Sequence, residues 1–174
     1  MAERSATTND PAAHRAEFLT QMRRVPGAVA IIATSDGGER RGMAATAWTS
    51  VCADPPTMLV CVNRQASVHQ PISKTGRFAI NLLAATEAET VSVFSAQRGL
   101  DGDARFTVDQ WLSGPLGQPL LRQAVAAFEL RAVDSHTYGT HDIIIGEVQS
   151  MQLGPDEPAM VYCNGAICAA GPAG

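Results

Sequence analysis

The sequence predicts a mainly β domain of the α+β class, in which an antiparallel barrel or sheet is flanked by a few helices. Three observations lead to this fold class. Segments with strand character outnumber those with helical periodicity, and connections of hairpin length dominate the first half of the chain. No internal repeat, linker or low-complexity block divides the 174 residues, so one domain is expected.

The N-terminal segment is expected to contribute a tail and a short helix. Residues 1–13 are polar and rich in Ala and Thr, which predicts a disordered tail, and residues 14–170 are assigned to the folded domain. Residues 14–24 carry apolar side chains at helical spacing, and Pro26-Gly27 ends this amphipathic helix. Its apolar face consists of Phe18, Leu19 and Met22.

Strands are predicted to follow directly. Residues 29–34 form a compact β-type run, and the sequence Asp-Gly-Gly at 36–38 closes it as a hairpin. Residues 41–53 are rich in small and β-forming side chains, which predicts one second strand. The sequence Asp-Pro-Pro at 54–56 ends that strand because proline donates no ladder hydrogen bond. A third strand is expected at 58–62.

The remaining chain mixes strands with two short helices. Residues 95–117 are predicted to be a long irregular surface loop, anchored by Phe106 and Trp111. In the preceding helix, Val91 and Phe94 are expected to face inward. The expected helices span 67–74 and 87–94, and the expected strands span 78–82, 126–135, 142–152 and 159–163, before a Gly/Ala-rich tail.

Composition excludes several classes of protein. Thirteen basic against seventeen acidic side chains give a net charge of −4, which disfavours nucleic-acid partners. The N-terminus lacks the apolar run of a signal peptide, and the longest apolar run, 28–33, is far too short to span a membrane. A soluble cytoplasmic protein without membrane contact is therefore expected.

The four cysteines do not have the spacing of a metal site. No pair among them shows the two-residue gap from which most structural zinc sites are built, so no metal is expected. Cys52 and Cys61 are interpreted as small buried hydrophobic residues. Cys163 and Cys168 lie near the Gly-rich end, and for them a disulfide or a reactive thiol is an alternative to this interpretation.

Common catalytic motifs do not occur in the chain. Neither the G-x-G-x-x-G of a Rossmann domain nor a P-loop is present, and no G-x-S-x-G elbow supplies a nucleophilic serine. The feature that remains is a segment of small side chains. Such a segment would let a flat ring approach the backbone, while its hydroxyl groups bind ribityl or phosphate oxygens. A flavin fits this chemistry, and close packing of one sheet on another element is the alternative. The segment consists of Gly42, Ala44, Ala45, Thr46, Ala47, Thr49 and Ser50.

Two further features suggest ligand contacts. Arg64 and Ser67 precede a predicted helix and provide a fixed charge, a hydroxyl and free amides, as a phosphate site requires; a serine N-cap beside a solvated arginine is the alternative. His136 and His141 flank a predicted bend, where an imidazole either contacts a ligand or has a structural role.

Five segments, in this order and spacing, resemble the short-chain flavin reductases of the flavin-reductase-like, FMN-binding split-barrel family. These enzymes are the reductase components of two-component flavin-dependent monooxygenases. The resemblance covers residues 15–168. The segments are FLTQMRRVPGAVAIIAT (18–34), GMAATAWTSVCADPPTMLVCVNRQAS (42–67), GRFAINLL (76–83), GTHDIIIGEV (139–148) and PAMVYCNGAI (158–167).

The resemblance implies a split β-barrel homodimer with the flavin near the subunit interface. It implies that NADH or NADPH reduces FMN or FAD, which is then released to an oxygenase, and it leaves the choice of flavin open. His141 is implied to lie near the nicotinamide. The implied cofactor contacts are Pro26, Gly27, Ala28, Val29, Thr46, Ala47, Trp48, Thr49, Ser50, Cys61, Val62, Asn63, Arg64, Ser67, Phe78 and Asn81.

Some positions depart from the family pattern. Trp48 stands where phenylalanine is common, and Cys163 and Ile167 stand where the last segment usually has a histidine and an aromatic residue. Two other functions stay open at this point: a non-catalytic barrel that holds flavin or haem, and an oxidoreductase whose tightly bound flavin acts on an organic substrate.

Overall fold

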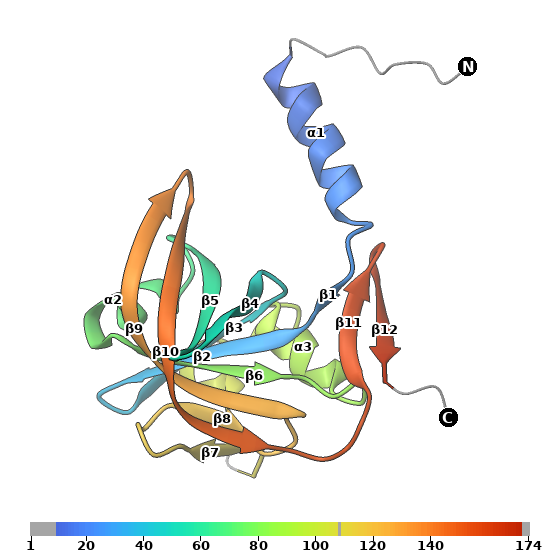
Figure 1. Cartoon of the computed structure of the whole chain (residues 1–174). Helices are drawn as coiled ribbons and strands as arrows, with labels where there is room; N and C mark the ends of the chain where they lie inside the picture. Colours follow the sequence, from blue (N-terminus) through green and yellow to red (C-terminus); the bar gives the residue numbers. More distant parts are fainter. Residues whose placement is uncertain (1–9, 108, 172–174) are drawn as a thin grey trace.

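The structure, a computed structural model that describes residues 10–107 and 109–171, is built on a seven-stranded antiparallel sheet that curls into a barrel (Figure 1). The strand order in this sheet is β3-β2-β6-β9-β10-β5-β4. The predicted mainly β fold is therefore confirmed. The strands are β2 (Ala30–Asp36), β3 (Glu39–Ala45), β4 (Trp48–Ala53), β5 (Pro56–Asn63), β6 (Arg77–Leu82), β9 (Ala126–Tyr138) and β10 (His141–Leu153).

The barrel closes between two strands that are neighbours in the chain. β3 pairs with β2 at one edge of the sheet, and β4 pairs with β5 at the other edge. Thr46 and Ala47 cross between these edges, and the Ala47 carbonyl accepts a hydrogen bond of 2.9 Å from Cys61 N–H. The prediction of one strand over 41–53 is wrong, because both halves have strand character but pair with different partners.

A second, three-stranded sheet lies beside the barrel and contains β1 (Gly27–Ala28), β11 (Ala159–Cys163) and β12 (Ala166–Ala170) in that order. The chain passes from this sheet to the barrel at Val29, whose N–H bonds to Met160 O and whose carbonyl accepts from Leu83 N–H. The described part of the predicted Gly/Ala-rich tail therefore contains a strand, β12. β12 was not predicted because its residues are small and lack alternation.

The core has two parts. One fills the barrel and contains Phe78, Leu130 and Ile144, all buried. The other lies outside the barrel, where α3 (Ala88–Phe94) and the hairpin of β7 (Trp111–Ser113) and β8 (Pro119–Leu121) cover the sheet.

Three aromatic rings hold this outer part together. The rings of Phe94, Phe106 and Trp111 lie with centroids 4.9 to 5.3 Å apart, in edge or tilted contact. Phe106 and Trp111 are therefore the anchors that the sequence predicts, although the segment they anchor is less irregular than expected. It contains strand β7, the first half of the β7–β8 hairpin, and a 3₁₀ turn (Gly102–Arg105).

Helix α1 (Pro11–Met22) projects from the molecule and buries none of its residues (Figure 1). Its start is explained by Asp10, which accepts a hydrogen bond from Ala12 N–H, and by proline at the first helical position. The helix thus begins three residues before the predicted domain start at 14, and residues 1–9 of the predicted tail lie outside the described residues. Among those described, no helix is both long and apolar enough to cross a membrane.

Candidate functional site

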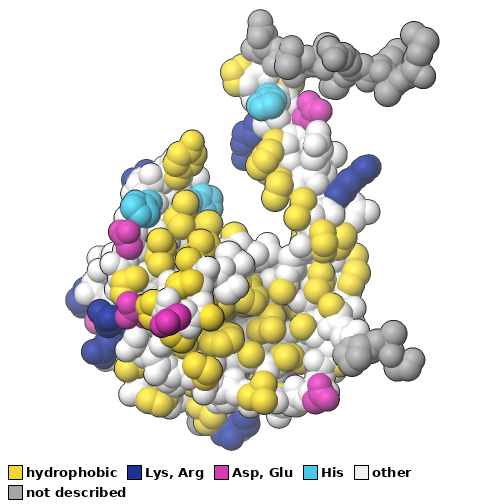
Figure 2. Space-filling model, in the orientation of Figure 1, with side chains coloured by type: hydrophobic (Ala, Val, Ile, Leu, Met, Phe, Trp, Pro, Cys, Tyr) yellow, Lys and Arg dark blue, Asp and Glu magenta, His cyan; other side chains and the backbone are white. Residues whose placement is uncertain are grey.

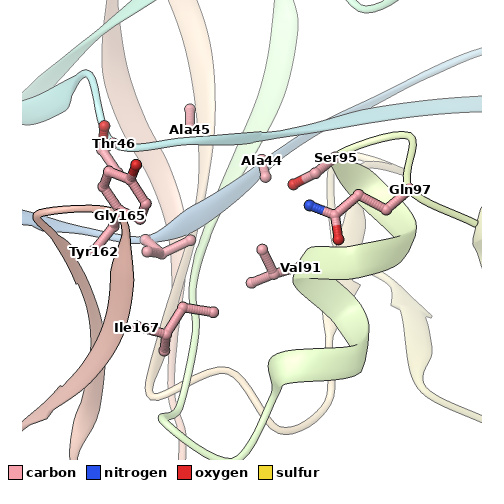
Figure 3. Close-up of a pocket in the computed structure, with 10 residues that line it drawn as sticks. Ala44, Ala45, Thr46, Val91, Ser95, Gln97, Tyr162, Gly165 and Ile167 are labelled. Atoms are coloured by element: carbon pink, nitrogen blue, oxygen red, sulfur yellow. The ribbon is translucent and has the colours of Figure 1, made fainter. Parts of the chain in front are cut away.

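A pocket of about 370 Å³ lies where the barrel meets the three-stranded sheet (Figure 3). Ala44, Ala45 and Thr46 at the end of β3 form one wall, and Val29 lies beside them. Figure 3 shows Val91, Ser95 and Gln97 projecting from the α3 segment, while Tyr162 and Ile167 project from the β11–β12 hairpin. The pocket is mostly apolar with a few polar groups at its margin, as sites for flat organic rings usually are.

Small side chains are required along this wall. A Cβ atom placed on Gly27 would lie 2.9 Å from the Cβ of Thr46, so β1 and the β3–β4 junction are already in contact. Thr46, Ala47, Thr49 and Ser50 are exposed, which leaves their hydroxyl and backbone groups accessible. The predicted segment of small residues is thus closely packed at Gly42, against Phe94, and partly buried at Ala44 and Ala45, whereas its other four positions form its exposed part.

A smaller cavity of about 200 Å³ lies at the far end of β5 and is formed by Asn63, Arg64, Gln65 and Thr140. Arg64 N–H donates to Thr140 O at 3.1 Å, and its guanidinium lies 3.4 Å from Gly139 O. The guanidinium is exposed and has no carboxylate partner among its hydrogen bonds in the described residues. It is available to an anion such as a phosphate.

Strand β5 passes the β3–β4 junction at Cys61 and ends at this cavity. Val60 and Val62 face the barrel interior, whereas Cys61 and Asn63 face outward, next to Ala47 and Arg64 respectively. The side chain of Val62 is therefore out of reach of a ligand, and this residue offers only its backbone. Neighbouring strands are about 4.8 Å apart, so β4 and β10 lie about 10 Å apart on either side of β5.

His141 begins β10 and pairs with Asn63 across the ladder. The imidazole is half-buried, and its Nδ1 lies 2.9 Å from the hydroxyl of Thr140. The next residue, Asp142, faces the barrel mouth, where His69 Nε2 lies 2.6 Å from one carboxylate oxygen and the Thr137 hydroxyl donates to the other at 2.8 Å. Hydrogen bonds from His69 and then from Thr137 lower the pKa of the Asp142 carboxyl.

Three predicted contacts lie elsewhere. Ser67 lines a separate polar cavity, together with Arg41 and Lys74, and does not cap α2 (His69–Thr75), whose N-cap is Val68. Phe78 is fully buried in the barrel interior, and Asn81 is fully buried on the other face of β6. The family resemblance implied that these two lie near the ligand, but both faces of β6 are covered.

The remaining predicted residues are close to the pocket. Pro26 is exposed just before β1, and Trp48 points inward from the start of β4, against the interior cluster. Sequence reasoning missed Ser95, Gln97 and Tyr162. The loop and the last hairpin that carry them have no periodic pattern that would indicate their direction, and only Tyr162 offered a signal, as an aromatic residue beside a Gly-rich turn.

The architecture defines a class: a split barrel with an apolar pocket at the β3–β4 junction and an exposed arginine at the end of β5. The family model "Flavin reductase like domain" matches residues 22–171. This chain belongs to that family.

Relatives with assigned names share most of its length. The FMN reductase (NADH) RutF of Stutzerimonas stutzeri is 36% identical over 148 residues, which is 85% of this chain and 84% of the relative. The reductase component of an FADH(2)-dependent resorcinol hydroxylase from a Rhizobium species is 35% identical over 159 residues, which is 90% of this chain and 88% of the relative.

Solved structures show the same fold. The NADH:FAD oxidoreductase SgcE6 of Streptomyces globisporus, in complex with NAD and FAD fragments, has a TM-score of 0.83 at 28% identity, and the match covers 96% of this chain and 98% of that one. The resemblance that the sequence predicted, and the split-barrel fold with it, are confirmed.

Proposed function

We propose that this protein is an NAD(P)H:flavin oxidoreductase that reduces FMN or FAD and supplies the reduced flavin to a partner monooxygenase. The observation that carries the proposal is the pairing of an apolar pocket beside Thr46 with the exposed guanidinium of Arg64 at the end of β5. These two features suit a nucleotide with a flat ring and an anionic tail. The names of the relatives, which are NADH-dependent flavin reductases or reductase components, support the same reaction.

The residues present fit a flavin. Gly27 and the small side chains of the β3–β4 junction let a ring approach the backbone, and the pocket volume of about 370 Å³ suits a ring system. Arg64 offers the positive charge that a phosphate needs. This local charge matters because the net charge of −4 opposes anionic ligands.

The chemistry comes from the two nucleotides: hydride passes from the nicotinamide to the flavin. The chain positions both partners. The pocket walls would hold the ring system flat and exclude water, and exposed backbone and hydroxyl groups near Thr46 would hydrogen-bond the ring edge. His141, with Nδ1 fixed by Thr140, is proposed to orient the nicotinamide nucleotide. No acid–base residue is required for this step.

An activity matrix tests the proposal. Oxidation of NADH and of NADPH is followed at 340 nm with FMN and with FAD, and turnover is expected with at least one pair. Stoichiometric flavin binding without turnover would instead favour a carrier. A preparation that stays yellow after desalting, and turns over only with an added organic substrate, would favour the enzyme with tightly bound flavin.

We also propose that the working form is a homodimer. Helix α1 exposes Phe18, Leu19 and Met22, and an isolated helix of twelve residues is only marginally stable in water. Figure 2 shows apolar side chains on the helix and also across the barrel surface that it faces over an open gap. A second copy would cover both surfaces reciprocally, as two-fold symmetry allows.

Light scattering during size-exclusion chromatography tests this assembly. The wild-type chain is expected at about twice 18.3 kDa. Phe18→Glu is expected to shift the protein toward the monomer, whereas Gln21→Glu, with the same added charge on the same helix, is not. A wild-type monomer at micromolar concentration would contradict the proposal.

A further inference from the structure

Trp48 bridges the two sheets at the pocket. Its indole N–H donates to the carbonyl of Ala28 at 3.0 Å. Ala28 is the last residue of β1 in the three-stranded sheet, and Trp48 is the first residue of β4 at the edge of the barrel. No other side-chain hydrogen bond in the described residues joins β1 to β4.

The bond lies next to the wall of the pocket. Val29 follows Ala28 and Thr46 precedes Trp48 by two residues, and both line the pocket. Gly27 and Thr46 are already in van der Waals contact, since a Cβ on Gly27 would come within 2.9 Å of Thr46. The distance between β1 and the β3–β4 junction therefore determines the shape of this wall.

The indole ring gives the bond a fixed position. It is half-buried and packs against the barrel interior, opposite Val60 of β5. Because packing already holds the ring, the hydrogen bond from its N–H to the Ala28 carbonyl costs little additional side-chain entropy. Phenylalanine would fill much of the same space but offers no donor, so the carbonyl would lose this partner.

We infer that Trp48 is a positioning residue that fixes the width of the flavin pocket through its hydrogen bond to Ala28. The inference rests on the proposed function, because it takes the pocket as the flavin site. Trp48 acts through the backbone of β1 and the β3–β4 junction. Its loss should weaken flavin binding and leave the affinity for the nicotinamide nucleotide unchanged.

The substitution Trp48→Phe tests the inference, and Trp111→Phe is the matched control because Trp111 lies in the outer core and does not line the pocket. Trp48→Phe is expected to raise the Kd and KM for flavin about five- to tenfold, the effect of losing one hydrogen bond. The KM for NADH should stay unchanged, and Trp111→Phe should leave the flavin Kd as in the wild type. Equal flavin Kd values for Trp48→Phe and the wild type would overturn the inference.

A second measurement uses the fact that the chain has only two tryptophans. In Trp111→Phe, Trp48 is the sole indole, and flavin should quench its emission with the same Kd that activity gives. Flavin binding without quenching would overturn the inference even if Trp48→Phe failed to fold. If the wild type oxidises no NADH, the proposed function fails, while quenching still reports whether flavin binds near Trp48, and the flavin Kd of Trp48→Phe whether binding depends on it.

Discussion

Asn81 allows a direct test of the site assignment, because the family resemblance implies that it contacts the cofactor, whereas the structure places it in the core. Its side-chain amide donates to Ile31 O and to Pro119 O, each at 3.2 Å, and its carbonyl oxygen accepts from Leu121 N–H at 2.8 Å. The residue is fully buried. Asn81 thus fastens the β7–β8 hairpin to the barrel.

Asn81→Ala should therefore destabilise the fold. Three hydrogen bonds are lost and their buried backbone partners are left unpaired, at about 1–2 kcal/mol each, so the free energy of unfolding should fall by about 4 kcal/mol. For a chain of this size, each kcal/mol lowers Tm by about 2–4 °C, which gives a fall of about 12 °C. Flavin affinity of the folded fraction should not change.

Urea unfolding and thermal unfolding measure these quantities, at equal protein concentration and without flavin, because ligands and assembly shift Tm. The control is Asn63→Ala, at the half-buried end of β5, where the side chain accepts a local hydrogen bond from Gln65 N–H, two residues away. That variant should lose flavin affinity and little stability. Wild-type stability of Asn81→Ala together with weakened flavin binding would refute the assignment.

Three further substitutions test the site. Arg64→Ala should raise the flavin Kd about tenfold and weaken the dependence of this Kd on salt, because a fixed positive charge is lost. The control is Arg98→Ala, which should change neither quantity, because the guanidinium of Arg98 pairs with an exposed glutamate. His141→Ala should raise the KM for NADH more than the flavin Kd, and unchanged KM and turnover for NADH would refute its role. The pKa of Asp142 is lower in the folded protein than in the unfolded chain, where it is about 4. The ionised carboxylate therefore stabilises the fold at a pH above the unfolded pKa, and this stabilisation is lost as the pH falls through the folded pKa. The difference in stability between the wild type and Asp142→Asn should therefore narrow below about pH 4 in urea titrations, and a constant difference from pH 7 to pH 3 would contradict the assignment.

Local sequence patterns predicted the elements that depend on neighbouring residues. The turn between β2 and β3 follows from Gly37 and Gly38, which both adopt positive φ angles, as a tight hairpin turn requires. Phe106 and Trp111 are large apolar residues in a polar stretch, so their burial could be predicted without knowing their partners. For Arg64, local sequence left a phosphate contact and a solvated arginine as alternatives, and the structure shows the residue exposed.

Residues 41–53 show where local patterns are insufficient. β3 and β4 have similar composition, but their partners β2 and β5 lie on opposite edges of the sheet. The break at Thr46 and Ala47 follows from barrel closure. Closure depends on pairing between distant segments, so a short stretch of sequence cannot predict it. The pocket depends on the same closure, because its walls come from the beginning, the middle and the end of the chain.

By itself, the sequence determined the strand-rich fold, the family resemblance and the small or charged residue types of the site. Tertiary structure alone decided which of those residues a ligand can reach. Burial depends on what covers each face of a strand, and the covering segments are distant in sequence. For that reason Asn81 became a core residue that binds the β7–β8 hairpin, whereas Thr46 stayed on the surface of the pocket.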